Sequence, residues 1–388
     1  MSSGKRCGMT ANRTRASGGA ALATGLALVL LAGCTGYPYV PCPPRMHRAL
    51  GEMRAGYGIV RLLYATDRKP TKANVASLYF GVDRDRSLNL GTCDVSIPAR
   101  HGCGRLETPL IPGLAQPDRH VMMLSLPGPL GQPAFLAELN RRLKRSPRRE
   151  VFVFVHGYYT SFQDAARLTA QIAHDAGFDG VAVCYSWPSE AWLTGYLVDA
   201  VNAQWTVPHL AEFLRMLAAE SEAAHVHVLA HSMGTRSVAR AIRELVQSHP
   251  DDLPRFDEII LAAADIDAEI FERDYAEPLS RASRRLTLYV STADWALGGS
   301  RFLHKYTRLG QTGPLTTGAA WMKNVEVIDA TAVDKGMVGH VYYAKSPAAL
   351  RDLAGVLQGL PPEQRGLRRE NDRYALEPIA PRGVRPQP

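Results

Sequence analysis

Residues 225–242, HVHVLAHSMGTRSVARAI, determine the fold expected for this chain. Residues 226–230 are mostly apolar and predict a short buried strand. Residues 238–242 place apolar side chains at the spacing of one helix face and predict a helix. The connection between the two is the pentapeptide Ala-His-Ser-Met-Gly at 230–234. The sequence therefore places Ser232 at an abrupt turn from a strand into a helix.

A serine at such a turn is held in a strained backbone conformation. The residues two before and two after it must be small, because larger side chains would collide. Ala230 and Gly234 meet this requirement, so we expect Ser232 to present its hydroxyl as a nucleophile. The alternative is that Ser232 only caps the following helix, because serine is a favoured N-cap residue.

The first residues are those of an export signal rather than of a fold. A basic start precedes an uncharged apolar run over residues 20–31, which is too short for a comfortable membrane span. The run ends in Leu31-Ala32-Gly33-Cys34, which resembles the lipobox of bacterial lipoproteins. Residues 1–33 are thus predicted to be a lipoprotein signal peptide. The resemblance implies that Cys34 is lipidated and anchors the protein in the cell envelope, facing the periplasm, with the outer membrane favoured; an uncleaved anchor is the alternative.

The chain has 388 residues, 46% of them hydrophobic, a length that suits one large α/β domain or two smaller ones. Residues 34–56 are proline-rich and predict an extended tether, and residues 57–360 the folded domain. Residues 361–388 are rich in Arg and Pro and predict a disordered tail.

The net charge is +8, which falls to about +4 when the four basic residues of the leader are subtracted. No basic run is interleaved with aromatic residues as a nucleic-acid surface would be, so no nucleic-acid partner is indicated. No His/Cys pair has metal-ligand spacing, and we expect neither metal nor cofactor. Cys93 and Cys103 flank a short loop, and a disulfide between them is left open.

Apolar segments alternate with helical ones from residue 133 onward. Residues 151–155, VFVFV, are apolar at every position, as in a parallel strand covered on both faces. Residues 58–126 before them are β-like. The alternation predicts an α/β fold with a mostly parallel central sheet flanked by helices, preceded by a β-rich portion.

A serine hydroxyl needs a base to take its proton, and the base needs an acid to orient it. In hydrolases with this turn the chain order is serine, acid, histidine. His340 follows the last strand through a Gly-rich loop and is the expected base. Asp294, which follows the strand at 286–290, is favoured as the acid, with Asp265 or Asp267 after the preceding strand as the alternatives.

The oxyanion of an acyl-transfer reaction needs two backbone N–H donors. We expect these from Met233, directly after the serine, and from Tyr158, in the loop after residues 151–155. His156 and His231 are interpreted as structural neighbours of the site. Apolar residues at helical spacing over 192–205 could line an acyl pocket, but a core-facing helix is the preferred interpretation.

With these motifs in hand, the chain resembles a bacterial family of α/β-hydrolases of unknown function that includes many lipoproteins. The segments that carry the resemblance, which covers residues 57–357, are YATDR at 64–68, VSIP at 95–98, FVHGY at 154–158, YSWPS at 185–189, AHSMG at 230–234, DID at 265–267 and GH at 339–340. It implies the α/β-hydrolase fold and the pairing of Ser232 with His340.

The sequence therefore predicts a serine hydrolase, similar to carboxylesterases and lipases, that cleaves an ester or thioester through an acyl-enzyme on Ser232. Its substrate would be a small-molecule or lipid ester. The alternative is a non-catalytic envelope protein that uses the same fold as a binding scaffold.

Overall fold

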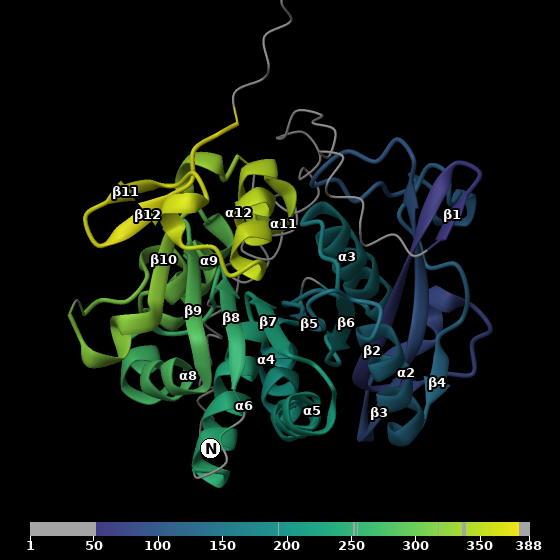
Figure 1. Cartoon of the computed structure of the whole chain (residues 1–388), viewed down its shortest axis with the longest axis horizontal. Coiled ribbons are helices and arrows are strands. Elements are labelled where there is room, and N and C mark those ends of the chain that lie inside the picture. Colours follow the sequence, from purple (N-terminus) through teal and green to yellow (C-terminus); the bar gives the residue numbers. More distant parts are fainter. Residues whose placement is uncertain are drawn as a thin grey trace, which may run out of the picture.

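The computed structural model describes residues 52–379, except residues 193, 251, 252, 254, 317 and 336–338. The predicted signal peptide, Cys34 and most of the tether lie outside the described residues. Within the described part, the strands form one 12-stranded sheet in the order β11-β12-β10-β9-β8-β7-β5-β6-β2-β3-β4, with β1 paired to β2 (Figure 1). No helix in this part is long and apolar enough to cross a membrane.

The elements follow one another from the N-terminal β-rich portion into regular strand–helix alternation. The strands are β1 (Glu52–Arg54), β2 (Tyr57–Pro70), β3 (Phe80–Pro98), β4 (Gly128–Leu130), β5 (Glu150–Val155), β6 (Val181–Ser186), β7 (His225–His231), β8 (Phe256–Ala262), β9 (Ser283–Val290), β10 (Val325–Asp329), β11 (Arg368–Glu370) and β12 (Arg373–Ala375). The α-helices are α2 (Gln132–Leu143), α3 (Phe162–Asp175), α4 (Tyr196–Trp205), α5 (Val207–Glu220), α6 (Gly234–Ser248), α7 (Ala268–Ile270), α8 (Ala276–Ala282), α9 (Trp295–His304), α10 (Leu309–Thr312), α11 (Tyr342–Lys345) and α12 (Pro347–Leu357). Single turns of other helix types are η2 (Ala76–Leu78), η3 (Pro112–Leu114), η4 (Phe271–Tyr275), η5 (Ala320–Asn324), η6 (Thr331–Val333) and η7 (Pro362–Gln364).

The centre of the sheet is parallel and its margins are antiparallel. Each neighbouring pair from β12 through β10, β9, β8, β7, β5 and β6 to β2 runs parallel. The long strands β2 and β3 form an antiparallel pair that adds the N-terminal β-rich portion to the edge of this core. The predicted α/β class, with a mostly parallel sheet flanked by helices, is confirmed.

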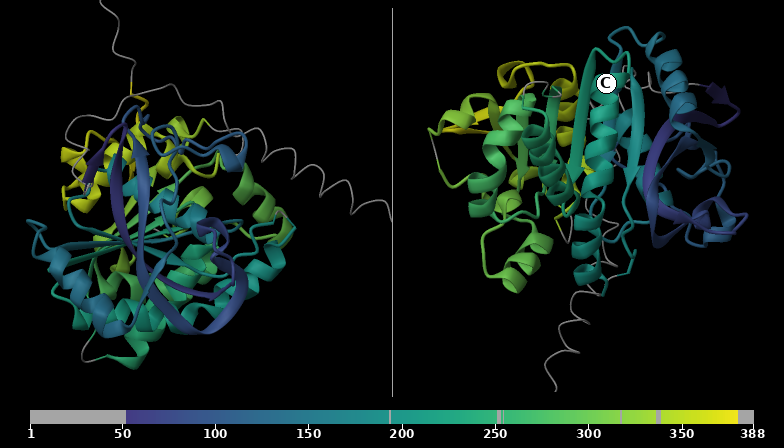
Figure 2. Two further views of the ribbon diagram at one scale, coloured as in Figure 1. Left: turned by 90° about the vertical axis from the view of Figure 1, so that its right-hand side faces the viewer. Right: turned by 90° about the horizontal axis from the view of Figure 1, so that it is seen from below.

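The apolar strand β5 shows how the two faces are covered. Val151, Val153 and Val155 point into one buried cluster, which they share with α2, α5, α6 and α8. Phe152 and Phe154 point to the opposite face, into a cluster with α3, α11 and α12. The two helical layers lie on opposite faces of the sheet (Figures 1 and 2), which explains why all five residues of this strand are apolar.

The expectation of a domain ending at 360 and a disordered tail is wrong for residues 361–379. There β12 pairs in parallel with β10, and β11 pairs back onto β12, so the tail extends the sheet. Leu376 is buried, and the guanidinium of Arg365 forms ion pairs with Glu326 and Asp352. The Arg/Pro-rich composition does not indicate disorder here, because Arg365 is buried against acidic partners elsewhere in the chain. Residues 380–388 lie outside the described residues.

The structure decides two further points. Cys93 and Cys103 are both buried free thiols, so the possible disulfide between them does not form. The core-facing interpretation of the apolar residues at 192–205 is wrong for Trp192, Leu197 and Val201, which are 72%, 75% and 56% exposed, whereas Tyr196 packs against the core.

Candidate active site

The strand-to-helix turn after β7 has the geometry that its sequence predicts. Ser232 has a φ of +52°, a conformation that costs energy for any residue with a side chain. A Cβ on Gly234 would lie 2.2 Å from the carbonyl oxygen of His156, so only glycine fits there. The N-cap of α6 is Met233, with no side-chain cap, while the Ser232 hydroxyl points elsewhere. The helix-cap interpretation of Ser232 is therefore wrong.

The structure brings together three side chains that are far apart in the sequence. Ser232 Oγ lies 2.7 Å from His340 Nε2, and His340 Nδ1 lies 2.8 Å from Asp294 Oδ2. The serine follows β7, the aspartate begins α9 after β9, and the histidine ends the loop before α11. The imidazole keeps 18% of its side-chain surface exposed, whereas Ser232 is 5% exposed, so the site opens to solvent on the side of the histidine.

Backbone contacts hold His340 in this position. His231 donates from Nε2 to the carbonyl oxygen of His340, at 3.0 Å. Burial first, and the nearby His340 second, depress the pKa of His231 well below its usual value, so its ring is neutral. Gly339 has a φ of +69°, and a Cβ there would lie 2.7 Å from the Ala293 carbonyl oxygen. His231 is thus placed beside the reacting groups as a support, and it takes no part in the Ser232–His340 hydrogen bond.

Asp294 is engaged through both carboxylate oxygens. Oδ2 accepts the hydrogen bond from His340, and Oδ1 accepts from the Leu297 amide as the N-cap of α9. Burial opposes protonation of His340, but the charge and hydrogen bond of Asp294 outweigh it and raise the His340 pKa. A second carboxyl group, Asp334, lies nearby and accepts from Ser291 Oγ; burial raises its pKa to about 7.

The alternative acids have other partners. Asp265 accepts hydrogen bonds from Tyr196, Arg236 and Ser300 at 2.6–2.8 Å. Burial would raise its pKa, but the guanidinium charges, Arg236 first, lower it instead. Asp267 caps α7 by accepting from two backbone amides. Neither carboxylate is hydrogen-bonded to His340.

The predicted oxyanion donors lie on the two segments that meet at Ser232. A Cβ on Gly157 would be 2.8 Å from the Cβ of Ser232, so the backbone leading into Tyr158 passes directly against the serine. Met233 is fully buried and directly follows the serine. The segments that carry the Tyr158 and Met233 amides therefore meet at Ser232.

A buried arginine that the sequence analysis left without a role fastens the loops around the serine. Arg68 donates to Ser186 Oγ and to the carbonyl oxygens of Thr160, Ser189 and Gly81, at 2.7–3.1 Å. Burial lowers its pKa to about 10. One guanidinium thus connects β2 and β3 to the loops after β5 and β6. The signal in the sequence was its place in YATDR, but its four partners are distant along the chain and could not be identified there.

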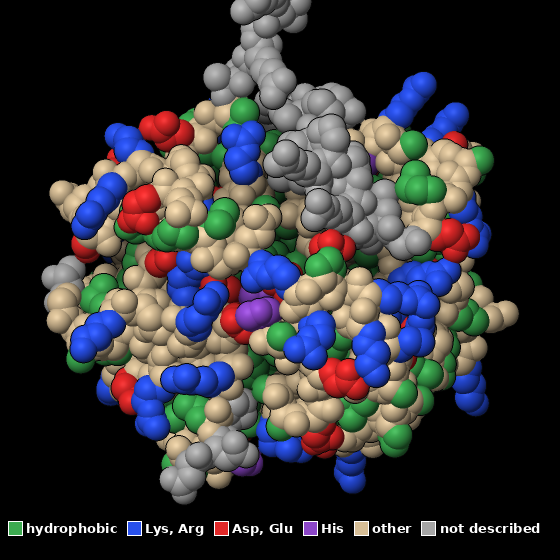
Figure 3. Space-filling view, in the orientation of Figure 1, with side chains coloured by type: hydrophobic (Ala, Val, Ile, Leu, Met, Phe, Trp, Pro, Cys, Tyr) green, Lys and Arg blue, Asp and Glu red, His purple; other side chains and the backbone are tan. Residues whose placement is uncertain are grey.

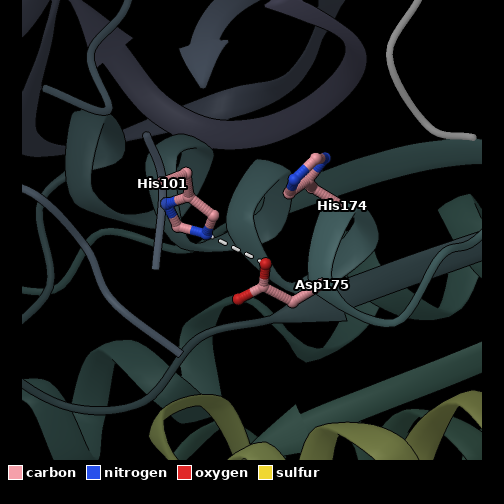
Figure 4. Close-up of side chains that lie close together, drawn as sticks. All are labelled: His101, His174 and Asp175. Carbon is pink, nitrogen blue, oxygen red and sulfur yellow. Dashed lines mark hydrogen bonds and ion pairs between the residues drawn. The ribbon is translucent and has the colours of Figure 1, made fainter. Parts of the chain in front are cut away.

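One group of potential metal ligands lies elsewhere, where α3 ends (Figure 4). Ligand atoms of His101, His174 and Asp175 lie within 4.8 Å of one another, and all three residues are buried. Both ring nitrogens of His101 are already bonded to carboxylates, Nδ1 to Glu107 at 2.8 Å and Nε2 to Asp175 at 2.9 Å. Burial opposes protonation, but these hydrogen bonds, Asp175 first, raise its pKa to about 10. The imidazolium has no lone pair for a metal, so the arrangement is a buried ion pair.

Comparison with known proteins identifies the family of the fold. A family model described as "Alpha/beta hydrolase of unknown function (DUF900)" matches residues 132–356, a range that runs from α2 to α12 and includes every residue of the Ser232–His340–Asp294 group. No curated protein matches the chain.

Proposed function

The chain belongs to this family of α/β-hydrolases of unknown function, and from that premise we propose that it is a serine hydrolase that cleaves an ester or thioester. The observation that carries the proposal is the continuous hydrogen-bond chain from Ser232 Oγ through His340 to Asp294. A hydroxyl 2.7 Å from an imidazole whose far nitrogen is held by a carboxylate is the arrangement that makes serine nucleophilic at neutral pH.

In the first half of the reaction, Ser232 Oγ bonds to the substrate carbonyl carbon while its proton passes to His340 Nε2. The carbonyl oxygen becomes an anion, which the amides of Tyr158 and Met233 stabilise. The buried carboxylate of Asp294 stabilises the imidazolium. The bond from carbon to the leaving oxygen or sulfur then breaks, and His340 returns the proton to the leaving group.

In the second half, a water molecule gives a proton to His340 and attacks the acyl carbon. The bond from carbon to Ser232 Oγ breaks, the proton returns to the serine, and a carboxylic acid leaves. Both halves balance with the substrate, one water molecule and the side chains and amides of this chain.

A fluorophosphonate probe tests the proposal most directly. We expect the probe to label the wild-type chain at Ser232, and the Ser232→Ala variant to lose both labelling and turnover of short p-nitrophenyl esters, by about 10⁵–10⁶-fold. Ser346→Ala is a matched control, because Ser346 caps α12 and its loss costs only about 1 kcal/mol. Equal labelling in Ser232→Ala would refute the proposal, whereas no labelling of the wild type would favour the binding-scaffold alternative.

We further propose that Cys34 carries lipid and tethers the folded domain to the envelope membrane. The support is the order basic start, apolar run, Leu31-Ala32-Gly33-Cys34 in the sequence, in a segment outside the described residues. Radiolabelled palmitate should be incorporated into the wild-type chain expressed in a bacterium and not into Cys34→Ser. Equal incorporation in both would contradict the assignment.

A further inference from the structure

Helix α9 presents an apolar face to solvent, the reverse of an ordinary surface helix. Leu297 and Ser300 point inward and are buried. Trp295, Phe302 and Leu303, on the opposite face, are 75%, 73% and 60% exposed. Soluble proteins expose single apolar residues routinely, but three large apolar side chains exposed on one short helix indicate a binding surface.

Helix α4 adds a second apolar face to the first. Leu197, Val198 and Val201 are exposed on it, and Trp192 is exposed just before it. The two helices contact each other through Tyr196, whose hydroxyl lies 3.0 Å from Ser300 Oγ. The exposed residues of both helices are together called the apolar rim: Trp192, Leu197, Val198, Val201, Trp295, Phe302 and Leu303.

The apolar rim is built onto the candidate active site. Asp294, which holds His340, is also the N-cap of α9. The ring of Tyr158 packs edge-on against Tyr196, with 5.5 Å between centroids, and its hydroxyl donates to the Trp192 carbonyl oxygen. Both helices of the rim are therefore joined by direct contacts to residues of the candidate active site, α9 through Asp294 and α4 through Tyr196.

Basic residues are exposed at α9. Arg301 lies on α9 and Lys305 directly after it, and residues 295–324 contain no Asp or Glu. At the start of α4 an acidic residue is present, because a Cβ on Gly195 would lie 2.9 Å from the Cβ of Glu190. Lys/Arg and Asp/Glu side chains are interspersed over the face drawn in Figure 3. Exposed tryptophan and phenylalanine flanked by cations are the composition of surfaces that insert into the headgroup region of anionic membranes.

We propose that the apolar rim docks on an anionic lipid bilayer and thereby presents lipid-borne esters to Ser232; the reaction, though not the docking, rests on the proposed function. The length of the chain permits it. Residues 35–51 separate Cys34 from the first described strand, and 17 residues can span at most about 60 Å, enough for the domain to turn any side toward the membrane that holds its anchor.

Tryptophan quenching by brominated phospholipid tests the docking without requiring any chemistry. The full chain is reconstituted into vesicles of phosphatidylcholine and phosphatidylglycerol, with and without brominated acyl chains. We expect about twofold weaker fluorescence in the brominated vesicles, because interfacial tryptophans lie within reach of the acyl chains. The W192F/W295F double variant should lose this difference. Replacing phosphatidylglycerol by phosphatidylcholine, or raising the salt, should reduce it.

A second measurement tests the substrate class. F302S/L303S should lower hydrolysis of a vesicle-borne phospholipid ester by about tenfold relative to hydrolysis of a soluble ester in the same preparation. The matched control is M53S. Met53 is an equally exposed apolar residue and lies on β1. This strand pairs with the start of β2, where Met53 is opposite Gly58. The part of β2 that pairs with the end of β6, Thr66 opposite Ser186, lies farther along the strand. This control should leave the ratio unchanged.

Equal tryptophan fluorescence in brominated and plain vesicles would overturn the docking proposal. The rim would then be covered by another part of this chain or by a second copy, and a dimer dispersed by F302S in light scattering would identify the second copy. Failure of the hydrolase proposal is separate: quenching must persist in Ser232→Ala, so quenching without fluorophosphonate labelling would leave the docking surface and remove the reaction.

Discussion

Replacing Asp294 by asparagine tests the assignment of the acid, because this carboxylate accepts two hydrogen bonds at once. Its oxygens receive the Nδ1–H of His340 and the N–H of Leu297. An amide has one oxygen and one NH₂ group, so it can accept only one of the two. If its oxygen stays on Leu297, the NH₂ faces His340 and favours the tautomer protonated at Nε2, which cannot accept the serine proton.

The expected loss of activity depends on which of the two hydrogen bonds the amide oxygen keeps. The wrong tautomer and the loss of the compensating charge should lower kcat by about 10³–10⁴-fold, equivalent to about 4–5.5 kcal/mol of barrier. If the amide turns the other way, α9 loses its cap at a cost of about 1 kcal/mol of stability, and the charge is still missing. The fold survives in either case.

The assay is turnover of a p-nitrophenyl ester together with chemical denaturation. Asp267→Asn is the matched control, because it makes the same chemical change in a carboxylate that caps α7 through Oδ1 alone. An amide oxygen can keep both of these bonds, so stability should change little and activity only a few-fold. The reasoning is refuted if Asp294→Asn stays within tenfold of wild type while Asp265→Asn abolishes turnover, because the acid would then be Asp265.

Three other changes have definite expected outcomes. Arg68→Lys keeps a cation but not the planar guanidinium that reaches Thr160 and three other acceptors. It should therefore cost about 2–4 kcal/mol of stability and lower kcat. An unchanged thermal denaturation midpoint would contradict the role of Arg68 in connecting these loops. The His101 pKa is raised to about 10, so its ion pair with Asp175 contributes its full stability below pH about 6.5 and loses it as the pH rises through about 10. His101→Gln should therefore lower the free energy of unfolding more at pH 6 than above pH 10 in denaturant titrations. Equal losses at the two pH values would argue against an imidazolium. Asp294 raises the His340 pKa, and only the neutral ring can take the serine proton. We therefore expect kcat/KM to fall as the pH drops through a value above 6.5, the usual pKa of histidine. A flat profile of kcat/KM from pH 5 to 9 would exclude His340 as the base.

The parts of the structure that sequence analysis predicted are those fixed by short-range sterics and burial. The all-apolar pattern of residues 151–155 follows from two covered sheet faces. Gly234 is needed because its α-carbon passes a backbone carbonyl oxygen at close range. In both cases the constraint comes from other segments, but it leaves a local pattern, an unbroken apolar run or a small residue two after the serine, and that pattern is sufficient for the prediction.

The parts that it missed depend on partners distant along the chain. The tail at 361–379 is ordered because β10 offers an unpaired edge and because Arg365 meets Glu326 and Asp352. Arg68 acquires its role from carbonyl oxygens on three other segments. Part of the stretch at 192–205 does form a helix, α4 at Tyr196–Trp205. Helical spacing alone, however, does not tell whether the apolar side chains of a helix face the core or the solvent.

The same limit explains why Asp265 and Asp294 were both plausible acids. They follow the adjacent strands β8 and β9, and the sequence does not indicate which carboxylate meets His340. In the structure Asp265 instead binds Tyr196 of α4, Arg236 of α6 and Ser300 of α9. These are the two helices of the apolar rim and the helix that follows Ser232. Asp265 thus joins the proposed membrane-facing surface to α6, while Asp294 caps α9 and accepts a hydrogen bond from His340, so the two acids hold α9 in one register relative to Ser232. We expect a ligand that moves α9 to change the hydrogen bond that His340 donates to Asp294, because Asp294 directly precedes Trp295, the first residue of α9.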